Sequence, residues 1–394
     1  MAGTKLNPIN ILFINPIPSS MGGIDAILPE LIRGLDKERY QAIVALPKQG
    51  DYVVRYREVG AKVFFVKFST IQRKRSLVAT LRSLARLVPS SFKLYRIIRR
   101  ENVKIVHTEK FNTLDGDIAA RLARVGAVHS IHEQPAPPMF AWKLLAKLVY
   151  LIANRIIVTC DASYSELPEL SVTRPKVRKV YNGITIPPLN AMDAVARRNV
   201  LGNNITGERQ IVGMVARLAP NKGQTNFLHA VPKVLAELPN TQFVIVGDVT
   251  SETSWEIEYR ESLHRLAEQL GLKDIVHFLG KRLDIYPVLQ AFDIFVHPAS
   301  SDILPTVVFQ AMAVGKPVVA TSVGGLPEIV GHNVTGIIVP PERPKLLAEA
   351  IIRLLRNRDE SHKMGVAART FACSKFSCEK YVENTERIYR ELLD

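Results

Sequence analysis

Two cationic side chains follow an apolar run in the second half of this 394-residue sequence. Arg217 and Lys222 lie in Val-Ala-Arg-Leu-Ala-Pro-Asn-Lys-Gly. Separated by five positions and a Pro-Asn turn, they can converge on a diphosphate, where arginine binds two oxygens at once and lysine acts as a point charge. A surface turn at a helix start explains the same residues about equally well, so the pair alone leaves both interpretations open.

A carboxylate and an amide are the next candidates, in Ser-Ser-Asp-Ile-Leu-Pro-Thr-Val-Val-Phe-Gln. Asp302 comes just before a helix that we expect to begin near Pro305, and Gln310 lies within that helix. Eight residues at 1.5 Å each span ~12 Å, so one nucleotide-sugar can contact both side chains. The alternatives are helix capping by Asp302 and a plain surface position for Gln310.

The first half offers weaker candidates. Gly22 and Gly23 stand between the first apolar run and the first helical pattern, where backbone can approach an anion closely, although a plain tight turn explains them better. His132 ends a predicted strand, and a lone histidine there is more often structural than catalytic. His107 and Glu109 carry the same caution. No Ser-His-Asp set and no glycosidase-like pair of carboxylates stands out.

Short apolar runs alternate with helical patterns along most of the chain, which predicts parallel sheets covered on both faces. We expect strands at residues 9–15, 42–46, 62–68, 104–107, 128–132, 155–159, 177–181, 210–216, 242–247, 275–279, 294–297, 317–320 and 336–339. Prolines and a glycine/asparagine cluster in residues 185–207 predict a linker. The sequence therefore predicts two doubly wound α/β domains, with ligands bound at the carboxyl ends of strands, facing a cleft.

The composition excludes several classes of protein. Apolar residue types make up 47% and charged types 23%, which excludes disorder, collagen and coiled coil as overall classes. The three cysteines cannot form a disulfide framework, and no Cys/His cluster indicates a zinc site. No signal-peptide pattern opens the sequence, and no apolar stretch reaches the ~18 residues of a membrane span. We expect a reduced, cytoplasmic protein, either soluble or peripheral on the inner membrane face.

The positive charge is confined to the first half. The formal charge is +15, and residues 1–189 hold 29 Lys+Arg against 14 Asp+Glu, whereas residues 190–394 hold 23 of each. Residues 59–100 contain eleven bases and no acid, with apolar residues interleaved at spacings of three and four. This pattern predicts an amphipathic segment, residues 73–100, that binds an anionic membrane surface. A solvated helical face is the alternative; no nucleic-acid recognition motif is present.

Taken together and in order, these segments resemble the retaining glycosyltransferases of family four, which have the GT-B fold. The most specific stretch runs from Phe278 to Val330 and includes Ala-Phe-Asp-Ile-Phe-Val-His-Pro, Ala-Met-Ala-Val-Gly-Lys-Pro-Val-Val-Ala-Thr and Val-Gly-Gly-Leu-Pro-Glu-Ile-Val. Met-Gly-Gly, Val-Tyr-Asn-Gly-Ile and Ala-Arg-Leu-Ala-Pro-Asn-Lys-Gly add to it. The resemblance is strong in the second half and mostly architectural in the first.

The resemblance implies a division of labour between the domains. Residues 1–189 would bind the acceptor, residues 190–375 would bind a UDP- or GDP-linked sugar, and the helix in 376–394 would pack back on the first domain. The implied reaction is sugar transfer, without a cofactor or a required metal, to a hydroxyl of a lipid-linked or envelope glycan at the membrane. A soluble small-molecule acceptor and a donor-binding scaffold that has lost catalysis are the alternatives; a nucleotide-sugar epimerase has no specific support.

The resemblance also implies roles for individual residues. Arg217 and Lys222 would bind the donor diphosphate, Gly22 and Gly23 would bring backbone against the donor, and His132 matches a histidine near the transferred sugar. The other implied donor contacts are Gly280, Arg282, Ile303, Leu304, Thr306, Val307 and Gln310.

One departure from the family pattern concerns its Glu-x7-Glu pair, in which the first carboxylate contacts the sugar and the second the ribose. Here the positions read Asp302 and Gln310. Asp302 keeps the charge on a shorter arm, whereas Gln310 can only make an uncharged, weaker hydrogen bond. Ile303 also stands where glycine is common. These differences predict changed donor handling or reduced activity.

Overall fold

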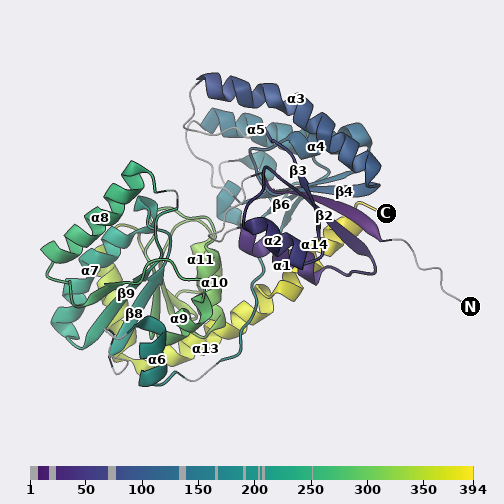
Figure 1. Ribbon diagram of the computed structural model, residues 1–394. Coiled ribbons are helices and arrows are strands. Elements are labelled where there is room, and N and C mark those ends of the chain that lie inside the picture. Colours follow the sequence, from purple (N-terminus) through teal and green to yellow (C-terminus); the bar gives the residue numbers. More distant parts are fainter. Residues whose placement is uncertain are drawn as a thin grey trace, which may run out of the picture. The chain divides into compact units, whose positions relative to one another are not determined.

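The computed structural model describes residues 8–16, 24–69, 77–132, 139–164, 167–189, 192–202, 205, 209–250 and 252–393. The chain forms two compact units (Figure 1). Unit 1 comprises Met1–Gly183 and Cys378–Asp394, and unit 2 comprises Ile184–Ser377.

Unit 1 is built on a parallel sheet in the order β3-β2-β1-β4-β5-β6-β7 among its described residues. The strands are β1 (Ile9–Ile14), β2 (Tyr40–Leu46), β3 (Lys62–Phe65), β4 (Val103–Thr108), β5 (Gly126–Ile131), β6 (Arg155–Val158) and β7 (Val177–Lys179). They are rich in valine, isoleucine and leucine because a parallel sheet is buried on both faces.

Helices cover both faces of this sheet (Figure 1). They are α1 (Ile24–Gly34), α2 (Tyr52–Glu58), α3 (Leu77–Arg100), α4 (Asp115–Ala123), α5 (Met139–Ile152) and α14 (Cys378–Arg390), with short 3-10 turns η1 (Asp161–Tyr164) and η2 (Pro168–Leu170). Helices α1, α2 and α14 share one core, whereas α3, α4 and α5 pack on the opposite face. The last helix of the chain therefore belongs to unit 1, where Tyr381, Ile388 and Tyr389 are buried.

Unit 2 is built on a second parallel sheet, in the order β10-β9-β8-β11-β12-β13 among its described residues. The strands are β8 (Gln210–Val215), β9 (Thr241–Val246), β10 (Val276–Phe278), β11 (Ile294–His297), β12 (Val318–Thr321) and β13 (Gly336–Val339). The helical elements are α6 (Ala194–Leu201), η3 (Pro220–Lys222), α7 (Gln224–Glu237), α8 (Ser254–Gln269), α9 (Ile285–Ala291), α10 (Thr306–Ala313), α11 (Leu326–Ile329), α12 (Pro344–Arg356) and α13 (Arg358–Lys375).

Both sheets reverse their strand order at one place, between β1 and β4 in unit 1 and between β8 and β11 in unit 2. The loops that leave the two strands on either side of such a point run in opposite directions, which opens a crevice at their carboxyl ends where ligands bind. The prediction of two α/β domains with parallel sheets is thus confirmed, and functional residues are expected at the carboxyl ends of the strands beside these two reversals.

Candidate active site

The turn after β8 is packed tightly on the turn after β11. Gly223 has a φ of +78°, and a Cβ there would overlap the backbone carbonyl of Pro298. Asn221 strengthens the contact, since its Nδ2 donates to the Ser301 carbonyl at 2.9 Å. Glycine at position 223 is therefore needed both for its left-handed backbone and for this close approach. The packing brings Lys222, at the end of η3, to the loop that contains Asp302.

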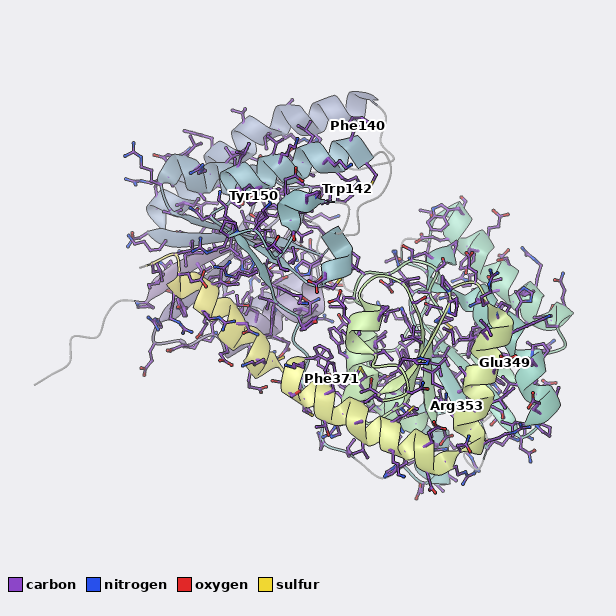
Figure 2. The ribbon with its side chains drawn as sticks, turned by 180° about the vertical axis from the view of Figure 1, so that it is seen from behind. Phe140, Trp142, Tyr150, Glu349, Arg353 and Phe371 are labelled. Atoms are coloured by element: carbon purple, nitrogen blue, oxygen red, sulfur yellow. The ribbon has the colours of Figure 1, made fainter. Side chains whose placement is uncertain are left out.

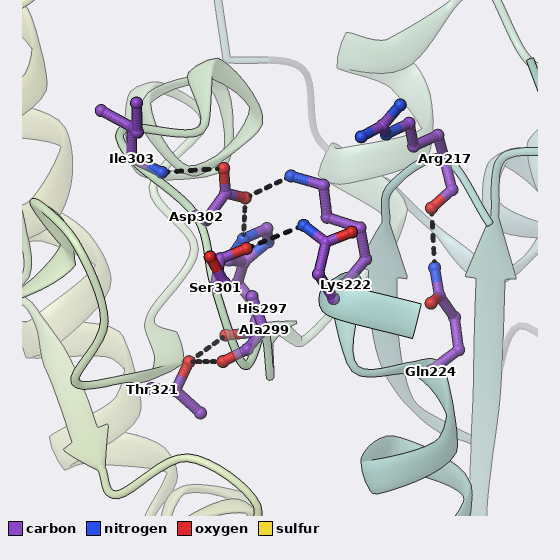
Figure 3. A network of polar contacts seen from close by, with 10 residues as sticks. Arg217, Lys222, Gln224, His297, Ala299, Ser301, Asp302, Ile303 and Thr321 are labelled. Atoms are coloured by element: carbon purple, nitrogen blue, oxygen red, sulfur yellow. Dashed lines mark hydrogen bonds and ion pairs between the residues drawn. The ribbon is translucent and has the colours of Figure 1, made fainter. Parts of the chain in front are cut away.

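Three groups converge on the Asp302 carboxylate (Figure 3). Lys222 Nζ lies 2.6 Å and His297 Nε2 2.9 Å from Oδ2, and the Ile303 N–H donates to Oδ1 at 3.0 Å. Burial of the Asp302 carboxyl by itself raises its pKa, but the hydrogen bond from His297 and the charges of His297 and Lys222 outweigh burial. The pKa of Asp302 therefore lies well below its ordinary value, so the group is ionised throughout the physiological range.

His297 was not among the candidates from the sequence. It is the last residue of β11 and is almost fully buried. Its imidazole contacts the Asp302 carboxylate in the loop that follows the strand. A histidine closing a predicted strand five residues before an acid was the available signal. On its own it does not distinguish a ligand-site histidine from a packed one.

The turn after β12 packs against the loop that contains Asp302. Gly324 has a φ of +53°, and a Cβ there would overlap the Asp302 carbonyl oxygen, while the Gly325 N–H donates to the Ile303 carbonyl at 2.7 Å. The side chains of Ile303 and Leu304 are buried. Helix capping does not explain Asp302, because α10 has Pro305 at its N-cap position and no side-chain cap. The loop instead presents the carboxylate to Lys222 and His297.

The remaining predicted donor contacts of unit 2 occupy the carboxyl edge of the same sheet or the helix that follows. Arg217 follows β8 and is exposed, and its carbonyl accepts from Gln224 Nε2 at 2.9 Å (Figure 3). Gly280 follows β10, and its carbonyl accepts from the Gly247 N–H at 2.8 Å. The Arg282 guanidinium donates to Asp284 Oδ1 at 2.7 Å and to the Val200 carbonyl at 2.8 Å, so this side chain is already paired within unit 2.

Helix α10 supplies the last predicted donor contacts. Thr306 and Val307 are its first two residues, whose N–H groups have no acceptor within the helix. Gln310 is half-buried one turn further on. The Ile303 N–H, in contrast, already donates to Asp302, so this amide is committed to holding the carboxylate rather than free for a ligand.

In unit 1, His132 and Glu109 come together at the carboxyl edge of the sheet. His132 Nε2 lies 2.9 Å from Glu109 Oε2, and Glu109 itself follows β4, where its N–H donates to the Ile14 carbonyl at 3.0 Å. Behind them, His107 Nε2 is 3.4 Å from Glu109 Oε1, and His107 Nδ1 is 2.6 Å from the Tyr389 hydroxyl of α14. The three residues named cautiously from sequence thus form one chain of contacts.

Burial and neighbouring charges shift the pKa values of His107 and Glu109. Burial lowers the pKa of His107, although the neighbouring Glu109 carboxyl acts in the opposite direction. For Glu109, burial raises the pKa, but the imidazoles of His107 and His132 outweigh it, so the pKa of the carboxyl lies below its ordinary value. Glu109 is therefore an ionised, buried acceptor that fixes the orientation of the more accessible His132.

Gly22 and Gly23 lie outside the described residues. Within the part of the chain that the structure describes, no three His, Cys, Asp or Glu side chains gather in a way that could hold a metal ion.

Comparison with known proteins decides the family. Residues 198–371 match the family described as glycosyl transferases group 1, and residues 21–186 match glycosyltransferase family 4. The chain belongs to the family 4 glycosyltransferases. This glycosyltransferase is 25% identical over 391 residues to the UDP-Gal:alpha-D-GlcNAc-diphosphoundecaprenol alpha-1,3-galactosyltransferase of Escherichia coli, covering 93% of this chain and 96% of that one.

A second relative matches only about half of each protein. It is the GDP-mannose-dependent alpha-(1-6)-phosphatidylinositol monomannoside mannosyltransferase of Mycobacterium tuberculosis, 34% identical over 193 residues, or 47% of this chain and 48% of the other. Among solved structures, Anabaena HepE in complex with UDP gives a TM-score of 0.81 at 23% identity, covering 98% of this chain and 100% of the other. Sucrose-phosphate synthase from Thermosynechococcus elongatus gives 0.75 at 20% identity, covering 98% and 99%. These structures establish the GT-B fold of the glycosyltransferase.

Proposed function

We propose that this protein is a retaining glycosyltransferase that transfers a sugar from a nucleotide diphosphate to a hydroxyl of a lipid-linked or envelope glycan at a membrane surface. Unit 2 binds the donor and unit 1 the acceptor. The observation that carries the donor assignment is the cluster of Lys222, Asp302 and His297 where the strand order of unit 2 reverses. A cation and a carboxylate at this place suit a diphosphate and the sugar hydroxyls attached to it.

The donor phosphates are the natural partner of Lys222 and Arg217. A lysine ammonium carries three donors, so Lys222 can contact a phosphate oxygen while it keeps Asp302. Arg217 is exposed at the end of β8, and its planar guanidinium can bind two phosphate oxygens. The free N–H groups of Thr306 and Val307 at the start of α10 add a partial positive charge directed at the same anion.

The chemistry follows from this arrangement of charge. The bond between the anomeric carbon and the phosphate oxygen breaks, the acceptor hydroxyl oxygen forms the new bond on the same face, and the leaving phosphate takes the acceptor proton. Negative charge grows on that phosphate in the transition state, where fixed cations and amides stabilise it. The Asp302 carboxylate accepts hydrogen bonds from the sugar hydroxyls, and His132, oriented by Glu109, contacts the transferred sugar.

Gln310 takes the ribose position without a charge. Its amide oxygen can accept from a ribose hydroxyl, but such a neutral bond is weaker than one to a carboxylate. The backbone near Gly280 and Arg282 is left to contact the nucleobase, which fits a UDP- or GDP-linked donor equally. No metal takes part in this proposal.

The acceptor assignment is supported by charge and by relatives. The outer side of α3 exposes Arg86, Lys93, Arg96 and Arg99, and the helix contains no acid. Anionic lipid attracts such a surface. The Escherichia coli relative is named for alpha-D-GlcNAc-diphosphoundecaprenol and the Mycobacterium relative for phosphatidylinositol monomannoside. No described helix is long and apolar enough to cross a bilayer, so contact would be made from the surface.

A soluble acceptor is the second candidate, because other relatives are named for small polar acceptors. The D-inositol 3-phosphate glycosyltransferase of Corynebacterium jeikeium is 31% identical over 246 residues, 61% of this chain and 58% of that protein. The N-acetyl-alpha-D-glucosaminyl L-malate synthase of Bacillus anthracis is 25% identical over 310 residues, 76% and 78%. Both are consistent with the same donor site.

The test combines donor binding with transfer. In a thermal-shift panel of nucleotide diphosphates and their sugars, a true donor at a hundred times its Kd adds ~2.7 kcal/mol of stability. Radiolabelled sugar is then offered with a polyprenyl-diphosphate glycan, phosphatidylinositol or inositol phosphate. Label in a lipid product with the anomeric configuration kept is expected. Label only in the soluble product selects the second candidate, and a protein that binds donor but neither transfers nor hydrolyses it is a scaffold.

A further inference from the structure

Helix α5 exposes an unusual amount of apolar surface. Apart from Lys143 and Lys147, its 14 residues, Met-Phe-Ala-Trp-Lys-Leu-Leu-Ala-Lys-Leu-Val-Tyr-Leu-Ile, are apolar or aromatic. A surface helix normally buries one apolar stripe and exposes polar residues on the other side. Here both sides are apolar, so one of them faces water in the isolated chain.

The inward side is accounted for by packing. Ala146 and Val149 are fully buried in one core with Ile156 and Val158 of the sheet. The ring of Trp142, which Figure 2 labels on α5, stacks on Phe111 with centroids 4.9 Å apart. The carbonyls of Tyr150 and Ala153 at the end of the helix accept from Lys176 Nζ at 2.8 and 3.0 Å. Helix α5 is therefore firmly seated, and its outward residues do not serve the fold.

The outward stripe consists of Phe140, Leu144, Leu148 and Leu151, with Phe140 74% and Leu144 59% exposed. At 100° per residue these four positions fall within about 80° of the helix circumference. Lys147 lies along the same stripe and Lys143 beside it, and both are exposed. Large apolar side chains bordered by lysines are typical of helices that lie in a membrane interface.

The neighbouring helices carry the same character. Helix α3 exposes Val88 and Phe92 between its bases, and α4 contacts both α3 and α5. The only acids in these three helices, Asp115 and Asp117, are buried. The outer face of this layer thus exposes bases and apolar groups without an exposed carboxylate. A second copy of the chain would bring two positive faces together, whereas anionic lipid complements both the charge and the apolar stripe.

We propose that the outward stripe of α5 inserts into the interface of an anionic bilayer, with Lys143 and Lys147 at the headgroups. This inference rests on the proposed membrane acceptor and names the inserting element. Fourteen residues at 1.5 Å give about 21 Å, short of the ~30 Å hydrocarbon core, so α5 lies along the surface and does not span it. It begins seven residues after His132, at the same edge of the sheet, so the bilayer surface borders the acceptor site of unit 1.

Flotation with vesicles tests the stripe directly. The full chain is mixed with phosphatidylglycerol/phosphatidylcholine vesicles or with phosphatidylcholine alone. We expect Phe140→Ser/Leu144→Ser to reduce partitioning into anionic vesicles at least tenfold. The matched control, Leu283→Ser/Val334→Ser, removes equally exposed apolar residues from unit 2 (77% and 61% exposed) and should stay within twofold of the unchanged protein. A stripe variant that partitions normally overturns the proposal.

A second measurement retains the apolar surface and does not depend on a destabilising change. Tryptophan in Phe140→Trp should be quenched by lipids brominated on the acyl chain, whereas tryptophan in Leu283→Trp should not. Absence of quenching overturns the insertion. If the unchanged protein does not float with anionic vesicles but transfers sugar to a soluble acceptor, the stripe proposal fails and the glycosyltransferase assignment stands. A dimer that the stripe variant dissociates, without flotation of the unchanged protein, assigns the stripe to self-association and also overturns insertion.

Discussion

Lys222→Ala tests the donor site most sharply, because the structure gives Lys222 two roles that can be separated. One role is to neutralise Asp302, whose Oδ2 lies 2.6 Å from Nζ, with 16% and 13% of the two side chains exposed. The other, proposed role is to bind a donor phosphate. Removing the ammonium group impairs both, so loss of affinity in the single variant does not by itself identify the cause.

The magnitudes differ for the two roles. A buried charge that loses its only partner costs about 3–5 kcal/mol. Asp302 retains His297 and the Ile303 N–H, so we expect Lys222→Ala to lower the free energy of unfolding by about 1–3 kcal/mol. A charge-assisted contact to phosphate contributes about 1.5–3 kcal/mol, so the Kd for a nucleoside diphosphate should rise about 10- to 150-fold.

Asp302→Asn completes a double-mutant cycle that separates the roles. Asparagine removes the unpaired charge, so Lys222→Ala/Asp302→Asn should recover most of the lost stability but none of the lost affinity. Asp302→Asn alone should bind the diphosphate at least as tightly as the unchanged protein, because Lys222 no longer faces a counter-charge. Calorimetric titration with UDP and GDP, which lack the sugar that Asp302 is proposed to contact, reports affinity, and urea unfolding reports stability.

Two results would refute this reasoning. Unchanged diphosphate affinity in Lys222→Ala removes the lysine from the donor site. Affinity that recovers together with stability in the double variant shows that Lys222 only holds the Asp302 loop. Lys273→Ala, at an exposed lysine before β10 and so at the opposite edge of the sheet, is the control and should change neither quantity.

Four further predictions follow from single contacts. Gly324→Ala adds strain at a positive φ and an overlap with the Asp302 loop, so it should lower the free energy of unfolding by about 2 kcal/mol or more in urea melts. The control is Gly271→Ala, at a φ of +70° with open space around it, which should lose only about 1 kcal/mol. Equal losses would contradict the role of Gly324 in supporting the Asp302 loop. Glu109→Gln weakens the hydrogen bond that orients His132 by about 1 kcal/mol, so it should reduce kcat about fivefold while the KM for the donor is unchanged. An unchanged kcat in steady-state assays would exclude the role of Glu109 in orienting His132. Gln310→Glu should tighten binding of a nucleoside diphosphate several-fold in calorimetry if Gln310 faces the ribose, and no change would place the ribose elsewhere. Burial lowers the pKa of Lys316 to about 8 from an ordinary 10.5, so the native state loses this proton first and stability rises with pH between about 8 and 10.5. A shift of this size corresponds to about 3 kcal/mol, so Lys316→Met, although it loses the hydrogen bond to the Gln290 carbonyl, should be more stable than the unchanged protein at pH 7 and should lose that advantage towards pH 10. A difference independent of pH in urea unfolding would refute the cause.

Much of the architecture could be predicted because strands and helices follow from local patterns of apolar and polar residues in the sequence. The run Ile-Asn-Ile-Leu-Phe-Ile gives β1, and Ile-Phe-Val-His gives β11, since apolar runs bounded by turn residues form strands wherever a sheet is buried on both faces. Their alternation with helical patterns requires parallel sheets. The same reading predicted the charge and apolar residues of α3, because both are properties of composition and spacing alone.

The contacts within the candidate sites depend on tertiary structure. Lys222 meets Asp302, and Glu109 meets His132, only because the strand orders of the two sheets bring the ends of separate strands together. Tyr389 reaches His107 across 282 positions of sequence. No local pattern encodes such distances, so the sequence suggested these residues singly and could not pair them.

The sequence by itself determined the family, the two parallel-sheet domains and the location of the positive charge, because each is set by residue type and by spacing along the chain. Tertiary structure alone decided that Lys222 is paired with a buried carboxylate, that Gly324 holds that carboxylate's loop, and that the stripe of α5 faces outward. Those facts depend on which surfaces are left after the helices have packed, and packing is a property of the whole chain.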